Sequence, residues 1–158
     1  MKLLGVIHLP EYLEVVCKCV DELFPENPKS IMLELPADWN EFSKTIDFWR
    51  YENYPLQFFS SIAEKYRMHG TNIIYGETAS QEWSNLVGNF FKSNKKRNKL
   101  RERFMTQRII ETNPEIVIVG RKHAEEIKRK FTDAYYLAFA DGEFPYNKNL
   151  ADKVIRLD

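Results

Sequence analysis

Two short stretches of this 158-residue chain, LLGVIHLP at Leu3–Pro10 and VIVGRKHAEEI at Val117–Ile127, share one local pattern. In each, an apolar run typical of a buried strand leads into Gly-x-x-His, and a sequence that can form a helix follows. The chain has three histidines, and this pattern contains two of them, His8 and His123. Each copy of the pattern predicts a strand followed by a helix. The question is why two segments so far apart in the chain share it.

Strand-like and helix-like segments alternate along the rest of the chain. The predicted strands are Lys2–Leu9, Ser30–Leu35, Thr71–Tyr75, Glu115–Val119 and Ala134–Ala140. The predicted helices are Leu13–Phe24, Asp38–Glu52, Pro55–Met68, Ser80–Thr112 with a break near Gly88 or Ser93, and His123–Phe131. The C-terminal tail is predicted to form a loop with one last helical turn. This alternation predicts a single α/β domain over residues 1–158, with a mainly parallel sheet of about five strands and helices on both faces.

Composition and charge are those of an ordinary globular domain. Hydrophobic residues make up 44% of the chain, and 23 basic residues balance 23 acidic ones. Zero net charge argues against a protein that binds nucleic acid through its overall field. The apolar run at the N-terminus is too short for a signal peptide or a membrane span, and Cys17 and Cys19 point to different sides of a helix. We therefore expect a soluble, reduced, cytoplasmic protein, and nothing in the sequence defines its oligomeric state.

Polar residues stand where the predicted strands end, which is where ligands collect in an open parallel sheet. They are His8, Glu34, Glu77, His123 and Asp141, one for each strand in chain order; Glu34 lies at the end of its strand and the others follow theirs. Imidazole nitrogen and carboxylate oxygen are the usual ligands of zinc, manganese or cobalt ions in hydrolases. Such an ion would lower the pKa of a bound water, and a free carboxylate could take the proton. A hydrogen-bonded structural role is the alternative for each histidine.

The basic segment KSNKKRNKLRER at Lys92–Arg103 is the other conspicuous feature. Such a run is usually a solvated helix face. Within it, Arg101 lies on one helical stripe with Met105 and Arg108, at i, i+4 and i+7. A partly covered arginine on that stripe could hold a carboxylate or a substrate anion. We expect the third histidine, His69, to face water or the carbonyls of a helix end.

Four short motifs, taken in their order along the chain, resemble the pattern of the TraB/PrgY and Tiki superfamily, to which erythromycin esterase-like and ChaN-like proteins are related. They are Gly5-Val6-Ile7-His8, Leu33-Glu34-Leu35, Arg101-Glu102-Arg103-Phe104-Met105 and Gly120-Arg121-Lys122-His123. The resemblance implies an α/β fold with a metal-dependent hydrolytic centre that cleaves a peptide, amide or ester bond. Tiki-type members are proteases that use manganese or cobalt ions.

The resemblance also implies roles for individual residues. His8 and His123 would be metal ligands, and Glu34 would be a ligand or the general base. Arg101 would orient the substrate or a carboxylate, and Glu77 is a further catalytic candidate. The remaining substrate-binding candidates are Arg108, Gly5 and Gly120. The two glycines let the backbone turn or let a neighbour approach closely.

The chain also departs from the family pattern. It is short, and Leu100 stands where many relatives carry an acidic residue. Arg121 and Lys122 stand where small residues are commoner, and their charges would oppose a metal ion. A non-catalytic module that binds a small anionic or phosphorylated ligand at the same site is therefore the alternative function. Nucleic-acid binding through Lys92–Arg103 ranks last, because no recognised reader motif accompanies it.

Overall fold

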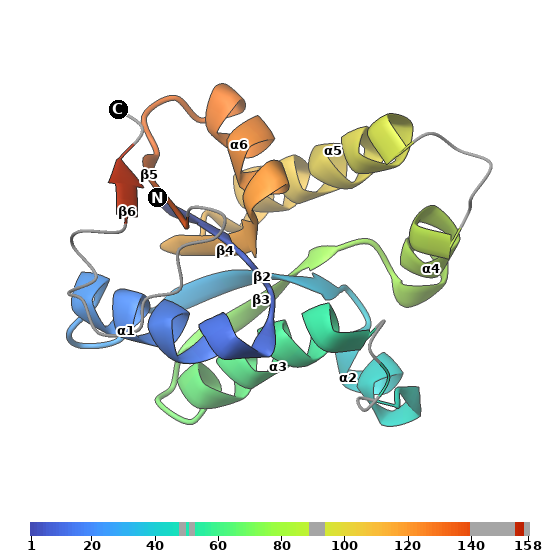
Figure 1. The fold of residues 1–158 in the computed structure, drawn as a ribbon, viewed down its shortest axis with the longest axis horizontal. Coiled ribbons are helices and arrows are strands. Elements are labelled where there is room, and N and C mark those ends of the chain that lie inside the picture. The colour runs from blue at the N-terminus through green and yellow to red at the C-terminus, as the bar shows by residue number, and fades with distance from the viewer. Residues whose placement is uncertain (48–49, 51–52, 89–93, 140–153, 157–158) are drawn as a thin grey trace.

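The computed structural model describes residues 1–47, 50, 53–88, 94–139 and 154–156, and strands alternate with helices throughout (Figure 1). The strands are β1 (Lys2–Val6), β2 (Ser30–Pro36), β3 (Asn72–Glu77), β4 (Ile116–Gly120), β5 (Tyr135–Phe139) and β6 (Val154–Arg156). The helices are α1 (Leu13–Leu23), α2 (Trp39–Phe42), α3 (Tyr54–Arg67), α4 (Ser80–Gly88), α5 (Asn94–Thr112) and α6 (Arg121–Lys130), with single turns η1 (Pro10–Tyr12) and η2 (Ser43–Thr45). One sheet has the order β3-β2-β4-β1-β5-β6. Its first five strands are parallel and β6 is antiparallel to β5, so the α/β prediction is confirmed.

The strand order explains why two motifs that are distant in the chain meet. β1 and β4 are parallel neighbours, and Gly5 lies opposite Val119 while Val6 lies opposite Gly120. The helices that follow these two strands cover opposite faces of the sheet: α1 lies on one face and α6 on the other (Figure 1). Where connections leave neighbouring strands toward opposite faces, a crevice opens at their carboxyl ends. Both Gly-x-x-His motifs therefore end at the same edge of the sheet, where the two connections diverge.

Two separate apolar clusters bury the two faces of the sheet. Successive side chains of a strand point to opposite faces. In β1, Leu4 and Val6 join the cluster under α1 and α3, whereas Leu3 joins the cluster under α5 and α6. The same alternation divides Ile118 from Val119 in β4. Because both faces are covered, the central strands read as unbroken apolar runs in the sequence.

The predicted helix over Asp38–Glu52 was wrong in its extent. α2 ends at Phe42, and after the turn η2 the backbone of Ile46 is extended. The ring of Phe42, the last residue of α2, packs edge-on against Trp39 within the helix and against Trp83 of α4, so a tertiary contact holds the segment where the helix ends. Asp38 does not cap α2 with its side chain. Its carboxylate instead accepts hydrogen bonds from the backbone N–H and the hydroxyl of Ser80 at the start of α4.

The other helices follow the predictions closely. α3 is followed by Gly70, whose φ of 82° is a left-handed conformation that favours glycine. α4 ends at Gly88 and α5 begins at Asn94, and residues 89–93, within which the predicted break would fall, lie outside the described residues. In the tail, Val154–Arg156 form a strand where one helical turn was predicted, and Asp141 lies outside the described residues. Both cysteines are free. Among the described residues, no helix combines the length and the apolar character needed to span a membrane.

Candidate functional site

Five of the predicted polar residues meet at the carboxyl edge of the sheet. His8 follows β1, Glu34 lies near the end of β2, Glu77 ends β3, and His123 lies in the first turn of α6. Arg101 reaches the same edge from α5. The sheet order accounts for this meeting, because β4 and β2 stand side by side with β1 and β3 as their outer neighbours.

Arg101 joins two buried carboxylates. Its Nη2 donates to Glu34 Oε1 at 2.5 Å and its Nε donates to Glu77 Oε1 at 2.7 Å, and Nη2 also contacts Glu77 Oε1. The three side chains are only 13%, 8% and 0% exposed. Burial acts to lower the pKa of Arg101, but the charges of Glu34 and Glu77 outweigh it and raise that pKa above its usual range. Arg101 is thus a permanently charged group whose Nε and Nη2 atoms already bind the two acids.

Glu34 is held as a carboxylate. Its Oε2 accepts a hydrogen bond of 2.7 Å from the backbone N–H of Gly120, and its Oε1 lies 3.7 Å from His123 Nε2. Burial would raise the pKa of Glu34, but the charges of His123, Arg101 and His8, together with the Gly120 N–H, lower that pKa to about 2. Glu34 therefore carries a negative charge at neutral pH, within reach of both imidazoles.

The pKa of Glu77 shifts in the opposite direction, upward. Burial raises its pKa, and the nearby charge of Glu34 adds to that effect, against the opposing charge of Arg101. Its Oε2 has no hydrogen-bond partner among the described residues. The two acids that share Arg101 thus have their pKa values pushed apart, as is common where one carboxyl group serves as a base and another as an acid.

His123 has a carboxylate partner that the sequence analysis did not assign. Its Nδ1 lies 3.1 Å from Glu102 Oε1, and the two side chains are 9% and 12% exposed. With a proton on Nδ1, the imidazole donates to Glu102, and its Nε2 atom lies 3.7 Å from Glu34 Oε1. Glu102 follows Arg101 directly, so helical spacing points the two side chains in different directions. Its place inside the arginine motif was the only sequence signal for a role.

The glycines of the two Gly-x-x-His motifs, Gly5 and Gly120, each leave room for a different neighbour. A Cβ atom at Gly120 would lie 3.3 Å from Glu34 Oε2 and 3.4 Å from His8 Cδ2, so the glycine allows the His8 ring to approach β4. A Cβ atom at Gly5 would lie 3.0 Å from the Cβ atom of Ala124, so that glycine allows α6 to pack against β1. Gly120 thus borders the site directly, whereas Gly5 positions the helix that carries His123.

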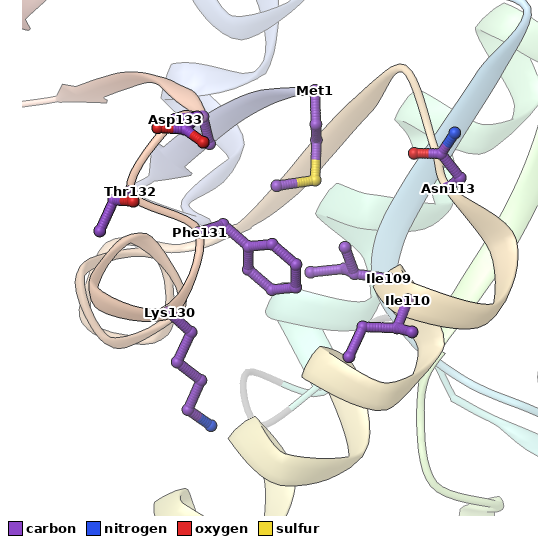
Figure 2. A pocket seen from close by; sticks show the side chains of 9 residues that line it. Met1, Ile109, Ile110, Asn113, Lys130, Phe131, Thr132 and Asp133 are labelled. Atoms are coloured by element: carbon purple, nitrogen blue, oxygen red, sulfur yellow. The ribbon is translucent and has the colours of Figure 1, made fainter.

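The other predicted anion-binding residue and two cavities lie away from this edge. Arg108 is two turns farther along α5, with Nη1 3.5 Å from Glu111 Oε2. A cavity of about 360 Å³ opens at the opposite edge of the sheet, where Met1, Ile109 and Phe131 gather (Figure 2). A second, of about 250 Å³, lies between α2 and α3. Neither cavity includes a residue of the site.

The arrangement does not fit the predicted metal site as it stands. Within the described part of the chain, no group of three or more His, Cys, Asp or Glu side chains is arranged to hold a metal ion. Both oxygens of Glu34 accept hydrogen bonds, one of them from the cationic Arg101. Binding by manganese, cobalt or zinc stays a prediction.

The charges of the site also bear on the alternative ligand. The guanidinium of Arg101 is shared by Glu34 and Glu77, and a further carboxyl group, that of Glu102, lies beside His123. A small anion would meet repulsion from the Glu34 carboxylate, and the Nε and Nη2 atoms of Arg101 already bind acids. The geometry is better suited to moving a proton between imidazole and carboxylate groups than to holding phosphate.

No family model, curated protein or solved structure matches this chain, so the resemblance to the TraB/PrgY and Tiki superfamily stays a prediction.

Proposed function

We propose that this protein is a hydrolase that cleaves an ester or amide bond, with His123 as the general base. The observation that carries the proposal is the distance of 3.1 Å between His123 Nδ1 and Glu102 Oε1. A carboxylate that accepts the Nδ1 proton fixes the orientation of the imidazole and stabilises the imidazolium that forms during proton transfer. The Nε2 atom is then the basic atom, and it lies 3.7 Å from Glu34 Oε1.

In the proposed reaction, Nε2 of His123 takes a proton from a water molecule as the water oxygen attacks the carbonyl carbon. The tetrahedral intermediate collapses when its C–O or C–N bond breaks, and the leaving oxygen or nitrogen takes the proton back from Nε2. His8, beside Gly120, donates a hydrogen bond to the developing oxyanion. Glu34 keeps both imidazoles in place through its charge. Positioned acid–base catalysis of this kind contributes about 10²–10⁴-fold in rate.

The order of the four motifs, which resembles that of the TraB/PrgY and Tiki superfamily, supports a hydrolytic reaction. The proposal needs no metal ion, because the Glu102–His123 pair supplies the proton acceptor. The non-catalytic anion-binding module is the weaker candidate. Arg101, one of the cations that it would use, already binds Glu34 and Glu77.

The test is hydrolysis of p-nitrophenyl acetate and p-nitrophenyl butyrate by the full chain. We expect His123→Ala to lower kcat/KM by about 100-fold or more, because the general base is lost. Glu102→Gln should lower kcat and change its dependence on pH, while Glu102→Asp should restore part of both. His69→Ala is the matched control, since His69 is an exposed histidine at the end of α3.

Circular dichroism spectra must first establish that each variant is folded. The proposal fails if the folded wild-type protein cleaves neither ester faster than His123→Ala does. It also fails if His69→Ala is as impaired as His123→Ala.

A further inference from the structure

A basic stripe runs along the first half of α5. It consists of Lys95, Lys99 and Arg103, which are spaced at i, i+4 and i+8 and are all exposed. Like charges at this spacing destabilise a helix, and cations near its N-terminus also oppose the helix dipole. Within the described ranges, none of the three has a hydrogen-bond or ion-pair partner. The stripe therefore weakens the helix, and an anionic partner would relieve the repulsion.

The stripe begins beside the proposed catalytic pair. Lys99 is three residues before Glu102, so the two side chains share a face of α5, and Arg103 follows Glu102 directly. At 1.5 Å per residue, Lys99 and Lys95 lie about 4.5 and about 10.5 Å along the helix axis from Glu102. The first turns of α5 extend past α6 (Figure 1). A substrate whose reacting bond lies at His123 can thus extend along the stripe.

We propose that the basic stripe binds the carboxylates of an acidic peptide segment next to the bond that is cleaved. This inference rests on the proposed hydrolytic function and names its substrate class. Lys95 and Arg103 are about 12 Å apart along the axis, the length of three to four residues of extended peptide. Alternate or successive acidic side chains of such a segment can each meet one cation.

Nucleic acid fits the stripe less well than an acidic peptide does. Tight binding to nucleic acid commonly involves about 6–10 phosphate contacts, whereas the stripe offers three exposed cations on a chain with zero net charge. The carboxylates Glu34, Glu77 and Glu102 would also repel a phosphate backbone laid across the site. A short acidic peptide can keep its charges over the stripe and its neutral reacting bond over His123.

The test compares two esters that differ only in charge. They are the p-nitrophenyl esters of acetyl-Glu-Glu-Glu-Ala and acetyl-Gln-Gln-Gln-Ala. With wild-type protein at low salt, we expect kcat/KM to be roughly tenfold higher for the acidic ester, and the ratio to fall toward one at 0.5 M salt. In the triple variant Lys95→Gln, Lys99→Gln, Arg103→Gln the ratio should be near one at any salt concentration.

The matched control changes net charge equally at exposed lysines on other elements, through Lys18→Gln, Lys29→Gln and Lys44→Gln. This control should keep the wild-type ratio. Binding of fluorescein-labelled versions of the two peptide acids, measured by anisotropy, gives a second readout that does not depend on turnover. We expect roughly tenfold tighter binding of the acidic peptide to the wild type, and equal binding of both peptides to the stripe variant.

The outcomes separate this inference from the proposed function. If both esters are cleaved equally well and both peptides bind equally, the stripe has no role in substrate binding and only the hydrolase proposal survives. If neither ester is cleaved faster than by His123→Ala, the hydrolase proposal fails, and the anisotropy measurement alone decides whether the stripe binds acidic peptide. Tighter, stripe-dependent binding of a 20-nucleotide oligonucleotide than of the acidic peptide would overturn the inference in favour of nucleic acid.

Discussion

Replacement of Arg101 by methionine tests the buried ion network at the centre of the site. Methionine preserves much of the length and apolar stem of the side chain but removes the guanidinium. Glu77, fully buried, would then lose its donor, and Glu34 would keep only the Gly120 N–H. Removing one partner of a buried ion pair costs about 3–5 kcal/mol. Because Glu77 can take up a proton when its partner is lost, we expect the lower part of that range.

The expected loss of about 3–4 kcal/mol is a large part of the total stability of about 5–15 kcal/mol for a domain. For a protein of this size it corresponds to a fall in Tm of about 6–16 °C. Urea denaturation followed by circular dichroism measures the free energy of unfolding. Arg103→Met is the matched control, because it makes the same change at an exposed position of the same helix. We expect that control to change the stability by less than about 0.5 kcal/mol.

The pH dependence of the Arg101→Met variant gives a second check. The pKa of Glu77 is already raised in the wild type by burial, and loss of the guanidinium raises it further. An acid with a raised pKa in the folded state destabilises the fold above that pKa and ceases to do so when it is protonated. The stability difference from the wild type should therefore shrink as the pH falls from 7 toward 4. If Arg101→Met lowers the free energy of unfolding at pH 7 by no more than Arg103→Met does, the stabilising role of the buried ion network is refuted.

Three further predictions concern the same edge of the sheet. Because the pKa of Glu34 is lowered from 4.5 to about 2, its charge contributes about 3 kcal/mol of stability above pH 4.5 that is lost as the pH falls to 2. Urea denaturation at several pH values should accordingly show that Glu34→Gln lacks this dependence, and an unchanged acid profile in the variant would contradict it. Gly5→Ala should lower the free energy of unfolding by about 1–3 kcal/mol, because the added Cβ atom would press on Ala124. Gly120→Ala should lower the free energy of unfolding by less than about 1 kcal/mol, and it should still slow ester hydrolysis because the added Cβ atom displaces His8. Equal thermal shifts for the two alanine variants would count against these roles. Dialysis against EDTA should leave hydrolysis intact, and a loss of activity that manganese, cobalt or zinc ions restore would return the metal ion to the mechanism.

Local sequence patterns were sufficient to predict the first five strands, most of the helices and a sheet covered on both faces. Apolar runs such as that in β4 and helical spacing such as that in α1 are properties of neighbouring residues, so they can be read from the chain alone. The helix predicted over Asp38–Glu52 was wrong beyond Phe42, whose ring packs against Trp83 of α4. That contact joins segments that are distant in the chain, and it leaves no periodic signal.

The sequence by itself determined that His8, Glu34 and His123 stand at or near the ends of strands in a parallel sheet, because strand ends can be recognised locally. Only the tertiary structure decided that β1 and β4 are neighbours, which brings the two Gly-x-x-His motifs together at one edge of the sheet. It also decided that Arg101 is neutralised by two acids while Glu102 turns to His123. The physical reason is that strand order and side-chain partners depend on which helices pack on which face, and those contacts span most of the chain.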